Sequence, residues 1–421
     1  MILGGNQETG YLVDVARGMG YRTIVADPNP NAPAKLSADL AYTVDATDIS
    51  ALSDIISTER VDGIVLGVAD PLVRAYFEVC SKAGYPCYVT PRSADAFSSK
   101  LRFESVCEAF GISTIPRYSP ELLGTPPSGA DLFPVLVKPS DGAAGVGISI
   151  CRDAGQLAST MSAANTITPN REWLIQRYMD CDDLFAYYTF VNGQAYLSAI
   201  ADRFTSRKQK SGSPVCVGAA YPSKYLERFL IEIDPKLVRM FKELGIQDGV
   251  LLIQFFADDM GFYAYDPGFR LQGEAPHIIL RQINKFDHRE MLIHYSVTGV
   301  MCQENFGELN DPRLRGKAAA TIWVLLRAGT IGAINGLESL ANHPMVVNCL
   351  QRFKVGDVIQ EHMLGTERQV FSRIYVVAPS KNDLAEVISF SRKNLQVLDS
   401  AGDNMILDML NPEHILKGSK V

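Results

Sequence analysis

Lys138 closes an apolar run, residues 133–138 (FPVLVK), and a loop of small residues follows it directly. A lysine at the end of a buried strand is costly to bury unless it meets an anion. The loop contains Gly142, Gly145 and Gly147, and glycine leaves backbone N–H groups free to bind phosphate oxygens. A β-branched run follows, so the spacing predicts a phosphate-binding turn between two hairpin strands. The alternative is a flexible hairpin with a solvated lysine.

A second run, residues 173–183 (WLIQRYMDCDD), predicts a strand that leads into an irregular segment ending in acids. The backbone groups of Arg177 and Met179 are placed to pair with an adenine edge. Asp183 lies four residues beyond Met179 and can accept hydrogen bonds from ribose hydroxyls, because an ionised carboxylate is only an acceptor. An exposed acidic turn explains the same pattern.

A third run predicts a hairpin whose three-residue turn places Gly261 in the left-handed conformation. Residue 258 then pairs with 262, and Gln254 pairs with Asp266. An acid beside a phosphate-binding loop is the arrangement that metal-assisted phosphoryl transfer needs. The alternative is an ordinary hairpin with a solvated acid at its end.

Arg270 follows this hairpin, and Glu274 and His277 lie on the loop after it. His277 is placed to accept a proton from an incoming amine, although a histidine satisfied by a backbone carbonyl is an equal alternative. Upstream, Arg203 at a predicted strand end can bind a carboxylate through two N–H groups, or lie on a solvated loop.

These side chains need elements that bring them together. The first ninety residues alternate between short apolar strands and helical patterns, which indicates a doubly wound parallel sheet that binds ligands beyond the carboxyl ends of its strands. Its first turn, residues 4–10, lacks both the dinucleotide and the Walker glycine pattern. The predicted strands are 1–3, 21–26, 41–44, 63–67 and 86–89, and the predicted helices are 11–18, 49–59 and 69–84. A linker helix containing Lys100, a strand-rich region (133–266), a helix (285–298) and an α+β region from residue 313 follow.

Composition excludes several classes of protein. The chain has 421 residues, enough for two to three domains, with 47% apolar and 21% charged residues, as in globular proteins. A net charge of −7 (40 − 47) disfavours nucleic acid and anionic membranes as partners. No apolar run reaches the ~18–20 residues of a membrane span. The start lacks a secretory pattern, and the eight cysteines form no CxxC pair, so we expect reduced thiols in the cytoplasm.

In this order, the features resemble the ATP-grasp superfamily, in its carboxylate–amine ligase branch with biotin carboxylase, carbamoyl phosphate synthetase and L-amino-acid-ligase-like enzymes. The match covers about residues 1–300, and residues 313–421 resemble the C-terminal extension of the L-amino-acid-ligase-like members. The strand lysine with its glycine loop and the stretch FYAYDPGFRLQ are the most specific parts.

The resemblance implies an α/β fold in three parts. These are a doubly wound parallel-sheet pre-ATP-grasp domain (1–92), an ATP-grasp domain (93–300) with a lid at about 120–182, and a C-terminal α+β domain (301–421).

The resemblance also implies ATP and Mg²⁺ as cofactors and a role for each site residue. Lys100 and Lys138 contact the ATP phosphates, and the loop with Gly142, Gly145 and Gly147 covers them. The resemblance implies that adenine and ribose are bound by Gln176, Arg177, Met179 and Asp183. It implies Asp266 and Gln254 as ligands of the metal ion. It implies a role in substrate binding for Arg203 and Glu274, and in catalysis for Arg270 and His277. The family usually has Glu at position 254 and Asn or an acid at position 268, where this chain has Gln254 and Gly268.

The expected function is ADP-forming ligation, in which ATP activates a carboxylate as an acyl phosphate and an amine displaces phosphate. The alternatives are a bicarbonate or carbamoyl-phosphate type of ATP-grasp enzyme, and a nucleotide-binding protein with impaired catalysis. The expected partners are a small-molecule carboxylate and an amine, with no nucleic acid or membrane, and a homodimer is a further expectation.

Overall fold

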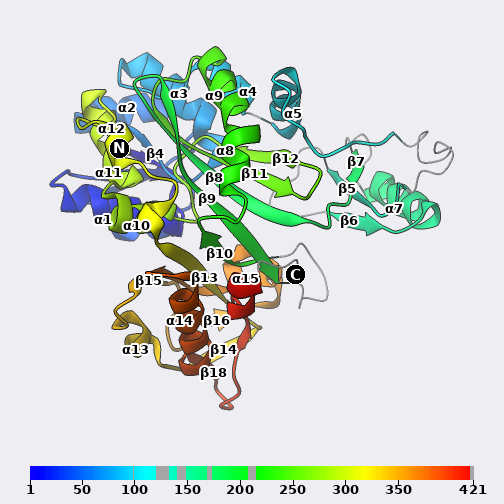
Figure 1. The fold of residues 1–421 in the computed structure, drawn as a ribbon. Helices are drawn as coiled ribbons and strands as arrows, with labels where there is room; N and C mark the ends of the chain where they lie inside the picture. Colours follow the sequence, from blue (N-terminus) through cyan, green and yellow to red (C-terminus); the bar gives the residue numbers. More distant parts are fainter. Residues whose placement is uncertain (98, 120–131, 140–147, 168–172, 207–214, 418–421) are drawn as a thin grey trace.

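The computed structural model describes residues 1–97, 99–119, 132–139, 148–167, 173–206 and 215–417. It confirms the α/β class: a parallel sheet with helices at the N-terminus is followed by antiparallel sheets (Figure 1). Among the helices that the structure describes, none has the length and apolar character needed to cross a membrane.

The N-terminal region is a four-stranded parallel sheet in the order β3-β2-β1-β4. The chain moves outward from β1 in both directions, so the sheet has a switch point between β1 and β4, and ligands bind beyond the strand ends at such points. Its elements are β1 (Ile2–Leu3), α1 (Gln7–Gly18), β2 (Ile24–Asp27), β3 (Leu40–Thr43), α2 (Ile49–Glu59), β4 (Val65–Leu66) and α3 (Val73–Ala83).

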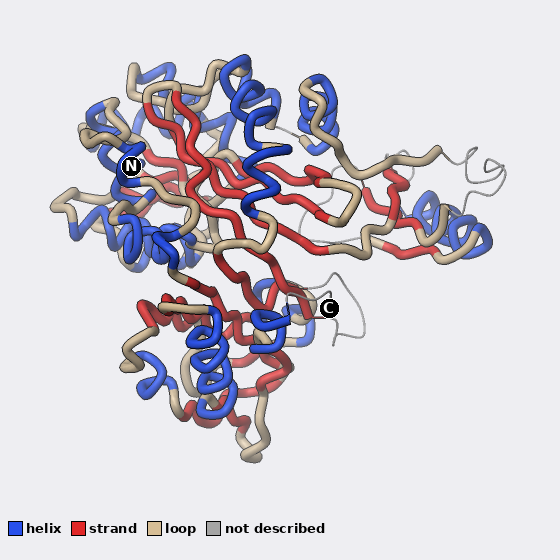
Figure 2. The backbone as a smooth tube through the Cα atoms, viewed as in Figure 1, coloured by secondary structure: helices blue, strands red, loops and turns tan. Residues whose placement is uncertain are grey.

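Two helices, α4 (Pro91–Ala96) and α5 (Lys100–Ala109), lead to a small antiparallel sheet in the order β6-β5-β7. Ser99 caps α5 by accepting a hydrogen bond from the Arg102 N–H. The sheet contains β5 (Val135–Pro139), β6 (Ser149–Cys151) and β7 (Trp173–Arg177), and α7 (Ala154–Ile167) accompanies it. It has a hydrophobic core of its own and projects from the rest of the chain at the right of Figure 2. It includes the described part of the predicted lid.

A nine-stranded sheet forms the centre of the molecule, in the order β12-β11-β8-β9-β10-β13-β17-β15 with β19 beside β13. The strands are β8 (Asp182–Val191), β9 (Gln194–Ser206), β10 (Val215–Tyr221), β11 (Gly249–Ala257), β12 (Phe262–Gly268), β13 (Ala318–Leu326), β15 (Val346–Gln351), β17 (Val370–Ala378) and β19 (Ile406–Asp408). The helices inserted between β10 and β13 are α8 (Leu226–Glu232), α9 (Asp234–Glu243), α10 (Pro276–Asn284), α11 (His288–Thr298) and α12 (Phe306–Leu309).

The C-terminal region continues this sheet. Residues of β10 pair with β13, and apolar residues of β10 belong to the same core as β13, β17 and α14. The sheet therefore runs across the predicted boundary between residues 300 and 301. The remaining elements are β14 (Gly329–Asn335), α13 (Leu337–Ala341), β16 (Val358–Ile359), α14 (Lys381–Asn394), β18 (Gln396–Asp399) and α15 (Pro412–Lys417).

The hairpin of β11 and β12 confirms one predicted pairing and corrects its turn. Gln254 pairs with Asp266 as predicted, but a bulge follows, so Ala257 pairs with Phe262 and the predicted 258–262 pair is wrong. Asp258 accepts hydrogen bonds from the N–H groups of Met260 and Gly261, which closes a four-residue turn without a positive φ at Gly261. The bulge restores the register that the longer turn would have shifted.

Two other predictions fail locally. Residues 86–89 pass between helices without joining the sheet. The loop expected after residue 270 contains α10, which begins at Pro276, a residue compatible with a first helical position because its missing N–H has no helical partner there.

Candidate active site

Asp266 lies at the centre of a group of charged side chains from four parts of the fold. The Lys100 Nζ at the start of α5 lies 3.8 Å from the Asp266 Oδ1. Burial raises the pKa of the Asp266 carboxyl, and nearby Asp70 adds to this, whereas Lys100, Lys138 and Arg270 favour the ionised form. The structure thus brings together four predicted site residues that span 170 positions of the sequence.

Lys138 stands on β5 of the small sheet, directly before the glycine loop. Burial lowers the pKa of its ammonium group to about 8, and Lys100 lowers it further, while Asp266 opposes this. Two lysines in one partly buried space repel each other, so an anionic ligand between them relieves both costs. Residues 140–147, and with them Gly142, Gly145 and Gly147, lie outside the described residues.

Arg270 is held in place by contacts at both of its terminal nitrogens. One donates to the Asp70 carboxylate at 2.6 Å and the other to the Leu271 carbonyl at 2.8 Å. Burial disfavours the charge, but Asp70, followed by Glu274 and Asp266, raises the pKa of Arg270 above its usual value. Its Nε is buried without a hydrogen-bond partner among the described residues. The guanidinium is therefore positioned, with one donor still available.

Gln254, Asp183 and Arg203 meet at the Tyr265 hydroxyl. That oxygen lies 2.8 Å from Asp183 Oδ1 and 2.7 Å from Gln254 Oε1, and Arg203 donates to the other Asp183 oxygen at 2.6 Å. A phenol has one proton, which the carboxylate accepts more strongly, so the Gln254 amide fits best when turned to donate to the phenol oxygen. Asp183, which was predicted to bind ribose, thus forms an ion pair with Arg203, which was predicted to bind a substrate. Both lie next to Gln254, the predicted metal ligand.

Phe256 stacks on the Tyr265 ring at 4.5 Å, and the Arg203 guanidinium lies 5.3 Å from the Phe185 ring centre. Burial raises the pKa of Asp183, and Arg203 lowers it. These contacts fix the network on one surface of the nine-stranded sheet.

The predicted adenine segment has a mixed outcome. The Gln176 side chain is buried and donates to Glu104 of α5, which also forms an ion pair with Arg117. The Arg177 N–H donates to the Pro116 carbonyl at 2.9 Å, so only its carbonyl remains for a base. Met179 lies in the connection between β7 and β8.

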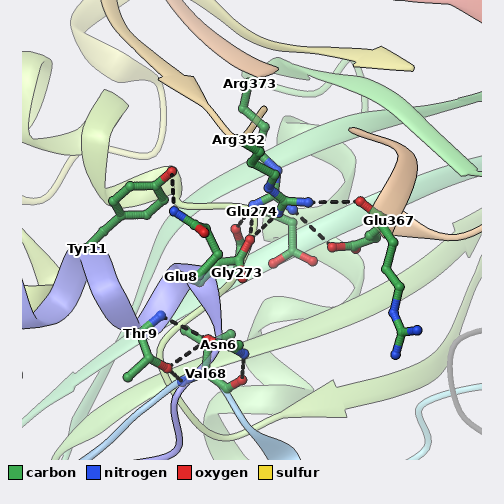
Figure 3. A network of polar contacts seen from close by, with 12 residues as sticks. Asn6, Glu8, Thr9, Tyr11, Val68, Gly273, Glu274, Arg352, Glu367 and Arg373 are labelled. Atoms are coloured by element: carbon green, nitrogen blue, oxygen red, sulfur yellow. Dashed lines mark hydrogen bonds and ion pairs between the residues drawn. The ribbon is translucent and has the colours of Figure 1, made fainter. Parts of the chain in front are cut away.

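Glu274 is positioned by the C-terminal region. Tyr375 on β17 donates to the Glu274 carbonyl at 3.3 Å, and Arg373 donates to the Gly273 carbonyl (Figure 3). Burial raises the pKa of the Glu274 carboxyl, and Glu367 adds to this. The Oε2 atom has no partner among the described residues. A buried acid with a raised pKa and a free oxygen takes up a proton more readily than an exposed acid does.

A cluster of acids and arginines surrounds this loop. Glu8 at the start of α1 forms ion pairs with Arg352 and, at 3.3 Å, with Arg373, which also contacts Glu367 at 3.0 Å (Figure 3). The Arg373 guanidinium lies 4.1 Å from the Trp323 ring centre. These contacts join the first helix to the residue that follows β15 and to β17.

An open cavity of about 550 Å³ adjoins this cluster. Its volume lies within the range of small-molecule sites, roughly 300–1,000 Å³. It is lined by Gly5, Asn6, Gln7, Glu8, Asp27, Asn29, Ala32, Pro33, Arg352, Phe353, Met363, Glu367 and Arg368.

His277 is enclosed next to this group, in a small cavity that Glu8, Gly273 and Arg373 also line. It is 3% exposed, its pKa is lowered well below the usual value by burial and then by Arg289, and it lines a cavity of about 10 Å³. A histidine that resists protonation is a poor acceptor for the proton of an amine.

Sequence reasoning missed Asp70, Tyr265 and Arg373. Asp70 lies three residues after the predicted strand 63–67, near the edge where such sheets bind ligands, but the predicted helix 69–84 contains it. Tyr265 and Arg373 lie within apolar strands, and only the tertiary fold reveals their partners.

The chain is similar to several known proteins, although no family model matches it. It is 29% identical over 170 residues to formate-dependent phosphoribosylglycinamide formyltransferase of Solidesulfovibrio magneticus, covering 39% of this chain and 43% of that protein. It is 27% identical over 281 residues to the carbamoyl phosphate synthase large chain of Paenarthrobacter aurescens, covering 62% of this chain and 24% of that protein. The chain thus spans less than half the length of these relatives.

Solved structures share almost the whole fold. The L-amino acid ligase from Bacillus licheniformis has a TM-score of 0.75 at 14% identity and covers 95% of this chain and 98% of its own. The biotin carboxylase domain of the Hydrogenobacter thermophilus 2-oxoglutarate carboxylase, in complex with MgADP, ADP and bicarbonate, has a TM-score of 0.74 at 16% identity and covers 94% and 90%. At this identity the likeness shows the fold.

Proposed function

We propose that this chain, which has the ATP-grasp fold, is an ADP-forming ligase that activates a carboxylate with ATP and joins it to an amine. The observation that carries the proposal is the convergence of Lys100, Lys138 and Arg270 on Asp266. Three cationic side chains and one carboxylate at the edge of a sheet fit a nucleoside triphosphate with its divalent metal ion.

Each residue has a role in this scheme. Lys100 and Lys138 bind the phosphates and neutralise their charge, and Asp266 and Gln254 are proposed ligands of Mg²⁺. When bound, Mg²⁺ neutralises and orients the phosphate oxygens. Gln176, Arg177, Met179 and Asp183 are proposed to face the nucleoside, and the glycine loop to cover the phosphates.

The chemistry has two steps. A carboxylate oxygen attacks the γ-phosphorus, ADP leaves, and an acyl phosphate forms. The amine nitrogen then attacks the carbonyl carbon and phosphate leaves. Arg270 stabilises the negative charge of both transition states, and Glu274 accepts the proton that the amine loses. The substrates are proposed to enter from the cavity beside Glu8, with Arg203 holding the Asp183 carboxylate in place.

The test is ADP and phosphate release from MgATP against a matrix of carboxylic acids, amino acids and amines, with mass spectrometry of the products. We expect ADP release that depends on both an acid and an amine. Bicarbonate is also tested in place of the acid. Release of ADP and phosphate with bicarbonate alone would support the carbamoyl-phosphate or carboxylation alternative.

The neutral Gln254 and Gly268 favour a second candidate, a nucleotide-binding protein with impaired catalysis. A ligand that binds the folded state stabilises it by RT ln(1 + [L]/Kd). Stabilisation by MgATP in thermal melts, without turnover on any pair, would support this candidate. No stabilisation by any adenine nucleotide would contradict both functions.

A homodimer in the cytoplasm completes the proposal. All eight cysteines are free in the structure, which suits a reducing compartment, and a solved neighbour is a biotin carboxylase domain dimer. Sedimentation of the purified chain tests the dimer.

A further inference from the structure

Asp70 is held at the switch point of the parallel sheet. It directly follows the loop after β4 and begins a short 3₁₀ helix (Asp70–Leu72). The Asn6 amide donates to the Val68 carbonyl at 2.7 Å, and the Val68 N–H donates to the Thr9 hydroxyl at 3.2 Å (Figure 3). The loop after β1 thus fixes the loop after β4, and both lie where such sheets bind ligands.

The Asp70 carboxylate lies beside Gly268, which has no side chain and stands on the hairpin of β11 and β12. A Cβ atom at Gly268 would lie 3.4 Å from the Asp70 Oδ1 and 3.8 Å from the Arg270 Cζ. Positions 266 and 268 on β12 are two residues apart, and such residues share one face of a strand. Asp70 therefore places its carboxylate next to Asp266, on the side where residue 268 would project.

One Asp70 oxygen is free. Its Oδ2 binds Arg270 at 2.6 Å, whereas Oδ1 has no hydrogen-bond partner among the described residues, and the side chain is 54% exposed. The Arg270 guanidinium, only 16% exposed, also has a buried Nε without a partner there. The Asp70 Oδ1 can accept and the Arg270 Nε can donate, so together they suit a ligand that has both positive and negative groups. A metal ion bound to phosphate has both.

The donor set suits Mg²⁺ together with a nucleotide. Mg²⁺ is usually bound by one or two carboxylates and by substrate phosphates. Within the described part of the chain, no group of three or more His, Cys, Asp or Glu side chains could hold a metal alone. Gln254 offers no charge, and its amide is engaged with Tyr265.

We propose that Asp70 supplies the second carboxylate of the metal–phosphate site, in place of the side chain that residue 268 lacks. Its Oδ1 binds the metal while its Oδ2 keeps Arg270 in position. The N-terminal sheet then takes a direct part in a site that the ATP-grasp hairpin cannot complete alone. This inference rests on the proposed function, because it requires a bound nucleotide.

The test is a Mn²⁺ titration followed by the electron paramagnetic resonance signal of free Mn²⁺, with ADP present and absent. Mn²⁺ replaces Mg²⁺ because it is visible, and no substrate is needed. The proteins are wild type, Asp70→Asn, Asp266→Asn and the control Asp45→Asn. Asp45 is an exposed acid that follows β3 at the same edge of the same sheet, and Asn can keep its hydrogen bond from Thr47.

We expect Asp70→Asn and Asp266→Asn each to weaken Mn²⁺ binding with ADP by about tenfold or more, since changes even to partners of metal ligands cost about 10–100-fold. Asp45→Asn should bind as wild type does. Thermal melts without ligand check that all four proteins fold.

A rescue separates metal binding from the positioning of Arg270. Gly268→Asp in the Asp70→Asn background returns a carboxylate to the hairpin itself, where a Cβ has ordinary contact distances. We expect this double variant to recover most of the lost Mn²⁺ affinity.

Wild-type Mn²⁺ affinity in Asp70→Asn, with ADP bound and Asp266→Asn impaired, would overturn the inference and leave the proposed function standing. Weaker binding that Gly268→Asp does not restore would overturn it as well. If wild type binds no ADP, the proposed function falls, and the inference falls with it.

Discussion

We expect Lys138 to make nucleotide affinity depend on pH. Its pKa is lowered to about 8 by burial and by Lys100, and nucleotide phosphates favour its charged form. Below pH 8 the lysine is already charged, so ADP affinity should be flat with pH. Above pH 8 binding must take up a proton, so affinity should fall by up to about tenfold per pH unit.

Calorimetry of ADP binding between pH 7 and 10, in buffers of different ionisation enthalpy, measures this proton uptake. Lys138→Arg keeps the charge throughout and should remove the dependence. A flat wild-type profile would take Lys138 out of the phosphate site. Because the unfolded lysine has the higher pKa, this group should also make the free energy of unfolding rise between about pH 8 and 10.5.

Arg270→Lys tests the planar guanidinium at constant charge. Arginine binds the Asp70 carboxylate and the Leu271 carbonyl and retains a third donor, whereas an ammonium group cannot reproduce this fork. We expect kcat to fall by roughly 10²-fold or more, as for the loss of one preorganised donor. Arg17→Lys, at an exposed ion pair with Asp39, is the control. Near-normal kcat in Arg270→Lys would make Arg270 a structural residue.

The sequence predicted the site residues that lie on single segments with a clear apolar strand pattern. Lys138 and Asp266 stand near strand ends directly before a proline, Arg270 follows the second of these strands, and the structure brings the three together. Asp70 could not be assigned in this way, because its partner Arg270 lies 200 positions away. His277 looked like a loop residue, but the helix that begins at Pro276 buries it.

At the scale of elements, the loops after β1 and β4 position Asp70, which we propose as the acid that the hairpin lacks. Gly67 lets them approach closely, because a Cβ there would lie 2.6 Å from both the Leu3 carbonyl oxygen and the Thr9 hydroxyl. Gly67→Ala should therefore lower the free energy of unfolding by about 1–3 kcal/mol, as overpacking does. It should also weaken Mn²⁺ binding with ADP, since Asp70 lies only three residues further along the chain.

Gly261→Ala is the matched control, because its Cβ would meet no atom within 4 Å and its φ is not positive. Chemical denaturation of both variants measures the difference. Equal stability of Gly67→Ala and wild type would show that the two loops can separate without cost.

The sequence also predicted the presence of helices and strands more accurately than the residues at which they end. The turn of the hairpin was predicted one residue too short, because the Asp258 side chain bonds that close it were not foreseen. The bulge after Gln254 then compensated, so the Gln254–Asp266 pair is correct although the predicted 258–262 pair is not. Side-chain caps and bulges depend on tertiary contacts that local patterns do not contain.

At the scale of the whole molecule, we expect the C-terminal region to fold together with the site. Its strands β13 and β17 extend the central sheet, and Arg373 and Tyr375 hold the Glu274 loop. A chain truncated after residue 311 would expose the β10 edge and the apolar residues that face β13. We expect it to aggregate or to bind a hydrophobic dye, because unpaired edges and exposed cores associate.

Expression of this truncated chain beside the full chain, followed by gel filtration and near-ultraviolet circular dichroism, checks this expectation. A soluble, cooperatively melting product would show that residues 312–421 are a separate domain, as the sequence boundary at 300 suggested.

In the proposed function, ATP activates a carboxylate as an acyl phosphate. The most direct measurement uses the acid identified by product screening, labelled with ¹⁸O in both carboxylate oxygens, together with MgATP and the amine. The oxygen that attacks the γ-phosphorus must leave with phosphate, so the account predicts ADP and phosphate carrying one ¹⁸O per product molecule formed. Phosphate without ¹⁸O, or AMP and pyrophosphate in place of ADP, would contradict it.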